Sequence, residues 1–222
     1  MAIDPSKLLL YLITDPYLCS NVGVDQTVDA SVKGGVTMVQ ILDKHASTED
    51  RVALAGRLKP ICASHGALFV INDDVRAAQI SDVDGVHIGQ GDIDVTLARQ
   101  TVGTDKIVGL SVETVSAVKQ VPVDLVDYVG ISPVYATPTK QDHKQPIGFQ
   151  GLAKICAASP VSSVAVGGLK LADCHSVLAT GVNGMAVVSA ICGQDDPYIA
   201  SRALAKSLAR YKRPVSYTHL RA

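Results

Sequence analysis

Short apolar runs recur at regular intervals along the chain, and this repetition constrains the fold more than any other feature. They lie at residues 8–13, 36–41, 67–71, 85–88, 106–110, 125–131, 162–167 and 184–189. Helix-like stretches, such as 48–63, 149–158 and 171–179, separate most of them. The repeat is about 25 residues long, which predicts successive βα units and a parallel sheet.

The number of βα units favours a closed barrel. Runs that are apolar throughout indicate strands covered on both faces, and eight of them predict a single (β/α)8 TIM barrel. The chain of 222 residues is close to the length of about 250 that such a barrel needs. An open, doubly wound sheet is the alternative, because a strand count cannot demonstrate closure. We assign residues 1–213 to one catalytic domain and 214–222 to a tail outside the fold.

The composition of the chain indicates which kinds of partner it can bind. A net charge of -1, 4% aromatic residues and no tryptophan argue against nucleic acid. No run approaches the roughly 18 apolar residues of a membrane span. Five cysteines without a CxxC motif indicate reduced thiols and a cytoplasmic protein. Small molecules are therefore the expected partners, and assembly into a homo-oligomer is left open.

Polar and glycine-rich segments follow the apolar runs. They are residues 14–17, 43–44, 72–74, 89–92, 111–114, 132–140, 167–169 and 188–191. The active site of a TIM barrel lies where strands end and βα loops begin. These segments are therefore expected to meet at one rim and to form the site.

Two of these segments predict a phosphate site. Gly167 and Gly168 would let backbone N–H groups approach an anion closely. Val188 and Ser189 are expected to begin a helix whose N-terminus favours negative charge. The loops after the last two strands are the common phosphate site of this fold. The alternative is a tight turn without a ligand.

Two carboxylates at the predicted rim suggest a metal. Asp73 and Asp92 follow neighbouring runs, and hard oxygen ligands of this kind suit Mg²⁺ that also bridges substrate phosphates. Asp73 could instead be the N-cap of a helix that begins near Val75.

The longest loop, at residues 132–148, is of a length typical of functional loops. Its hydroxyls and ammonium groups, at Thr137, Thr139, Lys140 and Lys144, suit an anion, although the lysines could serve only solubility. His87 is interpreted as a hydrogen-bonded core histidine. Ser111 lacks a GxSxG context, which argues against a nucleophilic serine.

Taken together, the rim segments resemble the thiamine-phosphate synthase family. The matching stretches are YLITD, GGVTMVQILDK, FVINDD, DGVHIGQGD, VGLSV, DYVGISPVYATPTK, VAVGGL and GVNGMAVVSAI, in that order from Leu10 to Ile191. The resemblance implies an enzyme that joins an aminopyrimidine methyl diphosphate to a thiazole phosphate and releases pyrophosphate, with Mg²⁺ as its cofactor.

The resemblance also implies roles for individual residues. Asp73 and Asp92 match the Mg²⁺ ligands, and Lys140 and Ser111 match residues at the reacting centre. The pyrimidine diphosphate positions are Gln40, Lys44, Asn72, Ser111 and Lys140, and the thiazole phosphate positions are Thr137, Thr139, Gly168, Val188 and Ser189.

The chain departs from the family at Leu42. The family pattern here is Gln-x-Arg-x-Lys, and leucine stands in place of the arginine, between Gln40 and Lys44 on the same face of the strand. Two other functions are therefore kept: a thiazole tautomerase-like enzyme, and a non-catalytic sensor of a phosphorylated ligand.

Overall fold

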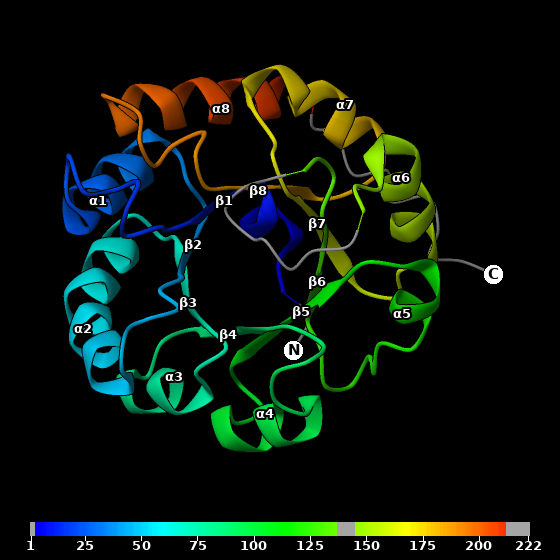
Figure 1. Cartoon of the computed structure of the whole chain (residues 1–222), viewed down its shortest axis with the longest axis horizontal. Helices are drawn as coiled ribbons and strands as arrows, with labels where there is room; N and C mark the ends of the chain where they lie inside the picture. The colour runs from blue at the N-terminus through cyan, green and yellow to red at the C-terminus, as the bar shows by residue number, and fades with distance from the viewer. Residues whose placement is uncertain (1–2, 137–144, 212–222) are drawn as a thin grey trace.

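Eight parallel strands close into a barrel (Figure 1). The structure is a computed structural model that describes residues 3–136 and 145–211. Its strands are β1 (Leu10–Ile13), β2 (Met38–Ile41), β3 (Leu68–Asn72), β4 (Gly85–Ile88), β5 (Ile107–Val112), β6 (Tyr128–Ile131), β7 (Ser162–Val166) and β8 (Gly184–Val187). β1 pairs with β8 as well as with β2, so the sheet has no edge. The predicted (β/α)8 barrel is confirmed, and the open sheet is wrong.

A ring of helices surrounds the barrel (Figure 1). The helices are α1 (Val24–Gly34), α2 (Thr48–Ser64), α3 (Val75–Ser81), α4 (Val95–Val102), α5 (Val115–Lys119), α6 (Gly148–Ala158), α7 (Cys174–Ala179) and α8 (Pro197–Tyr211). Short 3-10 helices precede β1 (η1, Pro5–Leu8) and α7 (η2, Leu171–Asp173). The stretch expected to be one helix at 171–179 is therefore two segments.

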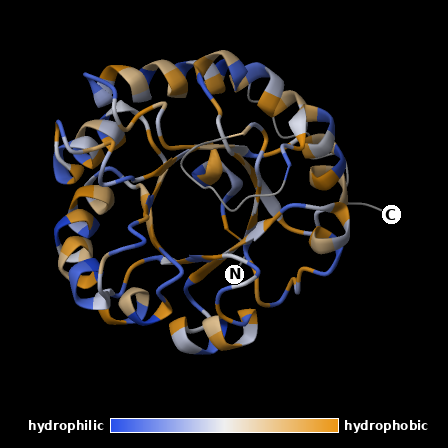
Figure 2. Cartoon of the chain, viewed as in Figure 1, coloured by the Kyte–Doolittle hydropathy of each residue, from blue (hydrophilic) through white to orange (hydrophobic). Residues whose placement is uncertain are grey.

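Each strand alternates between two cores, because successive side chains point to opposite faces. The outward side chains pack under the helices, as Leu12, Val39 and Ile71 do. In Figure 2 the barrel strands are mostly orange, and the outer helices alternate between orange and blue. The inward side chains form a second, smaller core that we call the inner cluster: Ile3, Leu8, Tyr11, Ile13, Met38, Val70, Tyr128, Val164 and Ala186.

The N-terminal segment covers the end of the barrel at which the strands begin. In Figure 1 the dark-blue η1 lies within the outline of the strands, and it contacts β1, β7 and β8. Ile3 and Leu8 pack into the inner cluster and are buried. Apolar side chains therefore fill the interior at the amino ends of the strands, and the polar side chains lie toward the carboxyl ends.

Three further expectations can be compared with the structure. All five cysteines are free thiols, and four of them are buried. Across the two described ranges, no helix is long and apolar enough to cross a membrane. The domain boundary expected at residue 213 lies outside the described residues.

One buried arginine ties the amino ends of two strands to a helix. Arg99 of α4 is 8% exposed, and its guanidinium donates to the Leu125 carbonyl and to Asp127 Oδ2 at 2.6 Å. The same carboxylate oxygen accepts the N–H of Val108 in β5 at 2.8 Å. Removing one partner of such a pair leaves a buried charge without compensation.

Arg99→Ala should therefore lower the free energy of unfolding by about 3 to 5 kcal/mol. Denaturant titration followed by circular dichroism measures this change. The matched control is Arg57→Ala, which removes an exposed ion pair with Asp25 and should cost about 1 kcal/mol or less. Equal effects of the two substitutions would contradict a special role for the buried pair.

Candidate active site

A cavity of about 690 Å³ lies at the carboxyl ends of the strands. This volume is within the range typical of small-molecule sites. Each predicted site residue that the structure describes lines it: Gln40, Lys44, Asn72, Asp73, Asp92, Ser111, Gly168, Val188 and Ser189. Thr137, Thr139 and Lys140 lie outside the described residues, as does Lys144.

Gln40 occupies the inward face of β2. It is only 2% exposed, and its amide accepts a hydrogen bond from the Tyr11 hydroxyl and donates to Asn72 Oδ1 at 2.6 Å. Leu42 is partly buried and packs against the inner cluster. Lys44 is exposed and also lines the cavity. All three residues thus line the cavity, Gln40 from within β2 and the other two from the segment that follows it.

The end of β3 presents Asp73 in an uncommon backbone conformation. Its φ is +60°, which is rare for a residue other than glycine. The Asn72 side chain donates to Asp73 Oδ2 at 2.5 Å. The alternative role of Asp73 as an N-cap is wrong, because the next residue, Asp74, caps α3 by accepting the Ala77 N–H.

Asp74 has a structural role beneath this carboxylate. Burial acts to raise its pKa, but hydrogen bonds from the Ala77 N–H, the Thr48 hydroxyl and the Arg51 guanidinium outweigh burial, so its pKa is lowered. Asp74 therefore remains charged and holds α2 and α3 together at the rim.

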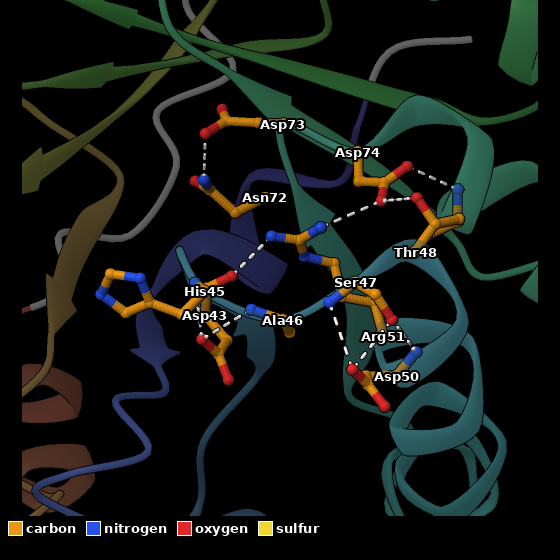
Figure 3. A network of polar contacts seen from close by, with 11 residues as sticks. Asp43, His45, Ala46, Ser47, Thr48, Asp50, Arg51, Asn72, Asp73 and Asp74 are labelled. Carbon is orange, nitrogen blue, oxygen red and sulfur yellow. Dashed lines mark hydrogen bonds and ion pairs between the residues drawn. The ribbon is translucent and has the colours of Figure 1, made fainter.

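Arg51 is a rim residue that was not predicted from the sequence. Figure 3 shows its guanidinium between the Asp74 carboxylate and the Asp43 backbone carbonyl, with N–O distances of 3.1 Å and 2.6 Å. Arg51 lines the same cavity as Leu42. It stands in the first turn of α2, after the capping box of Ser47 and Asp50. A cation in the first turn of a helix gave no functional signal in the sequence.

The end of β4 places a second carboxylate on the cavity. Asp92 Oδ2 accepts the N–H of Gly89 at 2.7 Å, which fixes the turn formed by Gly89–Gln90–Gly91–Asp92. Glu113, which follows β5, also lines the cavity and was missed. Acidic side chains thus reach the cavity from β4 and β5 as well as from β3.

The ends of β7 and β8, where a phosphate site is expected, line the cavity with a local structure that differs from the predicted one. Gly167 and Gly168 have φ of +109° and +69°, and a Cβ on Gly168 would lie 2.8 Å from Tyr135 Cβ. The expected helix after β8 is wrong: residues 188–193 form one turn in which the Val188 carbonyl accepts the N–H groups of Ile191 and Cys192, and α8 begins only at Pro197.

Lys170 is a second cation that the sequence analysis missed. Its ammonium donates to Ser189 Oγ at 2.7 Å, from the loop after β7 to the loop after β8. Lys170 is exposed, and a single exposed lysine in a loop carries no pattern. Its ammonium group therefore places a positive charge beside Ser189.

The closed barrel and the position of the cavity define the class of the protein as a (β/α)8-barrel protein with its site at the carboxyl ends of the strands. A family model described as thiamine monophosphate synthase matches residues 10–191. A thiamine-phosphate synthase from Psychrobacter sp. strain PRwf-1 is 48% identical over 200 residues, which cover 89% of this chain and 93% of that protein. Another from Albidiferax ferrireducens is 42% identical over 197 residues, which cover 89% and 90%.

A solved structure agrees with these relatives. Thiamine phosphate pyrophosphorylase from Pyrococcus furiosus superposes with a TM-score of 0.86 at 31% identity, over 94% of this chain and 99% of that chain. The chain belongs to the thiamine monophosphate synthase family. It is therefore an enzyme, a transferase of thiamine biosynthesis.

Lys170→Ala should weaken the binding of inorganic phosphate about tenfold, since a charge-assisted contact contributes about 1.4 kcal/mol or more. Isothermal titration calorimetry gives the Kd of each variant. Lys154→Ala, which removes an exposed lysine of α6, is the control and should leave the Kd at its original value. An unchanged Kd in the Lys170 variant would mean that Lys170 does not contribute to phosphate binding.

Proposed function

We propose that this enzyme joins 4-amino-2-methyl-5-(diphosphooxymethyl)pyrimidine to a thiazole phosphate, and that the products are thiamine phosphate and pyrophosphate. The observation that carries the proposal is the common cavity. The positions that match the substrate contacts of the family come from six different βα junctions, and those in the described ranges line one space.

The two ends of the cavity suit the two substrates. Gln40, Asn72 and Ser111 supply amide and hydroxyl groups near the barrel axis, which suits the ring of the pyrimidine. Lys44 stands above them at the mouth and suits the diphosphate. The thiazole phosphate would bind across the cavity at Gly168 and Ser189, where Lys170 adds charge.

Mg²⁺ is the proposed cofactor, and the donor set fits it. Asp73 and Asp92 offer hard oxygen ligands on the same cavity. Within residues 3–136 and 145–211, no group of three or more His, Cys, Asp or Glu side chains could hold a metal alone. This fits an ion that takes few protein ligands and completes its shell with water and substrate phosphate oxygens.

The proposed reaction is a dissociative substitution. The bond between the pyrimidine methylene carbon and the diphosphate oxygen breaks, and its electron pair leaves with pyrophosphate. The thiazole nitrogen then donates its lone pair to the methylene carbon, so no proton needs to be transferred. When bound, Mg²⁺ would neutralise charge on the departing pyrophosphate. Lys44 and Lys140 would add positive charge there, and the aminopyrimidine would delocalise the cation.

The chain's own residues would chiefly position the two reactants. The barrel holds the pyrimidine against Ser111 and Gln40 while the phosphate of the thiazole is anchored opposite, and such alignment alone supplies a large part of a rate enhancement. The free, mostly buried thiols support the cytoplasm as the compartment.

The decisive experiment is an assay in which the protein is incubated with both substrates and Mg²⁺, and the release of pyrophosphate is measured. Stoichiometric pyrophosphate and thiamine phosphate support the proposal. Conversion of a thiazole tautomer without pyrophosphate would indicate the tautomerase-like alternative. Binding of thiamine phosphate without turnover would indicate the sensor.

Asp73→Asn and Asp92→Asn should each reduce kcat about a hundredfold or more, because each removes an anionic ligand of the metal. Binding of the thiazole phosphate, measured by calorimetry, should change little, because its pocket lies at β7 and β8. Asp124→Asn, at an exposed position before β6, is the control. Undiminished turnover in either variant across a Mg²⁺ titration would reject the metal assignment.

Leu42→Arg should lower the KM for the pyrimidine diphosphate about tenfold, because it places a guanidinium on the face that carries Gln40 and Lys44. Leu42→Met, which keeps the size and removes no charge, is the control and should leave the KM unchanged. The same KM in all three proteins would mean that position 42 does not face the diphosphate.

A further inference from the structure

A continuous chain of side-chain hydrogen bonds crosses the inside of the barrel, and all of its members except Tyr128 line the cavity. Its members, in order, are Asp73, Asn72, Gln40, Tyr11, Tyr128, His87 and Ser111. They come from six strands or strand ends, β1 to β6. The successive donor–acceptor distances are 2.5, 2.6, 2.5, 2.9, 2.9 and 3.0 Å.

The barrel is built to accommodate this hydrogen-bond chain. The register places His87 beside Gly109, and Gly109 beside Tyr128. A Cβ on Gly109 would overlap the Tyr128 ring and lie 2.5 Å from His87 Nδ1. A Cβ on Gly130 would lie 3.1 Å from His87 Cε1. The two glycines therefore leave the space in which the histidine and tyrosine rings meet.

The Asp73 carboxylate fixes the orientation of the two amides. A carboxylate only accepts hydrogen bonds, so Asn72 must present its NH₂ group to Asp73 and its carbonyl oxygen to Gln40. Gln40 must then present its own NH₂ group to Asn72. The oxygen of Gln40 is left for Tyr11, which matches the observed arrangement.

The number of protons on Tyr11 and Tyr128 fixes which group donates in the next hydrogen bonds of the chain. A phenol has one proton to donate, and Tyr11 gives its proton to Gln40 Oε1. The bond between the two tyrosines therefore takes the proton of Tyr128. Because Tyr128 has then donated its own proton, its bond with His87 Nδ1 requires a proton on that nitrogen. Burial raises the pKa of both phenols, so both keep their protons at neutral pH.

The end of the hydrogen-bond chain is Ser111. A neutral histidine with a proton on Nδ1 has an unprotonated Nε2, which accepts hydrogen bonds. With His87 in this neutral form, Ser111 donates its hydroxyl proton inward to His87 Nε2, across the 3.0 Å that separates the two atoms. Only the oxygen lone pairs of Ser111 remain for a ligand in the cavity.

We propose that Tyr11, Tyr128 and His87 are positioning residues that keep Ser111 a hydrogen-bond acceptor, and so make the pyrimidine subsite select an amino group over an oxo group at ring position 4. This specificity rests on the proposed function, whereas the order of protons does not. An amino group donates to the Ser111 oxygen. An oxo group would set lone pairs against lone pairs and leave both without a partner, which sites of this kind reject strongly.

Tyr11 has no hydrogen bond with Ser111, yet its substitution should reverse the direction of the Ser111 hydroxyl. In Tyr11→Phe, the acceptor for the Tyr128 proton is lost, so Tyr128 donates to His87 Nδ1 instead. His87 then carries its proton on Nε2 and donates to Ser111, whose own proton turns toward the cavity. The same reversal follows in Tyr128→Phe, because His87 Nδ1 loses the Tyr128 hydroxyl while Nε2 keeps Ser111.

The first test is the tautomer of His87, read from the 15N chemical shifts of ring-labelled histidine in the ligand-free protein. His87→Gln identifies the signal among the six histidines of the chain. We expect a protonated Nδ1 and an unprotonated Nε2 in the unsubstituted protein, and the reverse in Tyr11→Phe. A protonated Nε2 in the unsubstituted protein, or an unchanged tautomer in both tyrosine variants, would overturn the proposal.

The second test compares the affinities of the 4-amino pyrimidine diphosphate and its 4-oxo counterpart, measured by calorimetry. We expect a preference of about a hundredfold for the amino compound, reduced at least tenfold in Tyr11→Phe and Tyr128→Phe. Val70→Ala is the matched control, because it removes volume from the inner cluster without changing any proton, and it should keep both the tautomer and the preference.

The two tests separate failure of this proposal from failure of the proposed function. If the protein binds neither pyrimidine, the proposed function fails, while the tautomer still decides the order of protons. If it binds both equally with Nδ1 protonated, the selection by Ser111 is overturned although the activity stands.

Discussion

The closure of the barrel is the constraint on which the rest of the structure depends. Because β1 pairs with β8, alternate side chains of every strand must enter one narrow interior, where they are shielded from water. Apolar groups fill this space toward the amino ends of the strands. The polar groups toward the carboxyl ends can find hydrogen-bond partners only in one another or in a ligand. The hydrogen bonds among Tyr11, Gln40, Tyr128 and His87 follow from this shielding.

The architecture was predictable from the sequence because it rests on a repeated pattern, whereas several site residues were not. An apolar run indicates a strand without knowledge of what the strand contacts in the fold, and the polar segment after it indicates the rim. Tyr11 and Tyr128 stand within apolar runs and look like ordinary core residues, so nothing in the pattern indicates their hydroxyl contacts. Lys170 and Arg51 reach the site through side-chain directions that only the folded chain defines.

The described part of the cavity is richer in acidic groups than in basic ones. Asp43, Asp73, Asp92 and Glu113 line it together with Lys44 and Arg51. Arg51 is held by Asp74 and a backbone carbonyl, so it stabilises the rim rather than replacing an arginine at Leu42. Among the described residues, this balance suits a diphosphate that is accompanied by a cation. The acidic excess and the proposed Mg²⁺ are thus two aspects of one electrostatic arrangement.

The N-terminal segment beneath the strands has a consequence for the order of events. Because η1 and the inner cluster fill the interior at the amino ends of the strands, the barrel is open only at the carboxyl ends. In the proposed reaction, two reactants would enter and two products would leave across the same rim. With the pyrimidine near the barrel axis, as proposed, the larger product would have to leave across this rim before the next pyrimidine could bind.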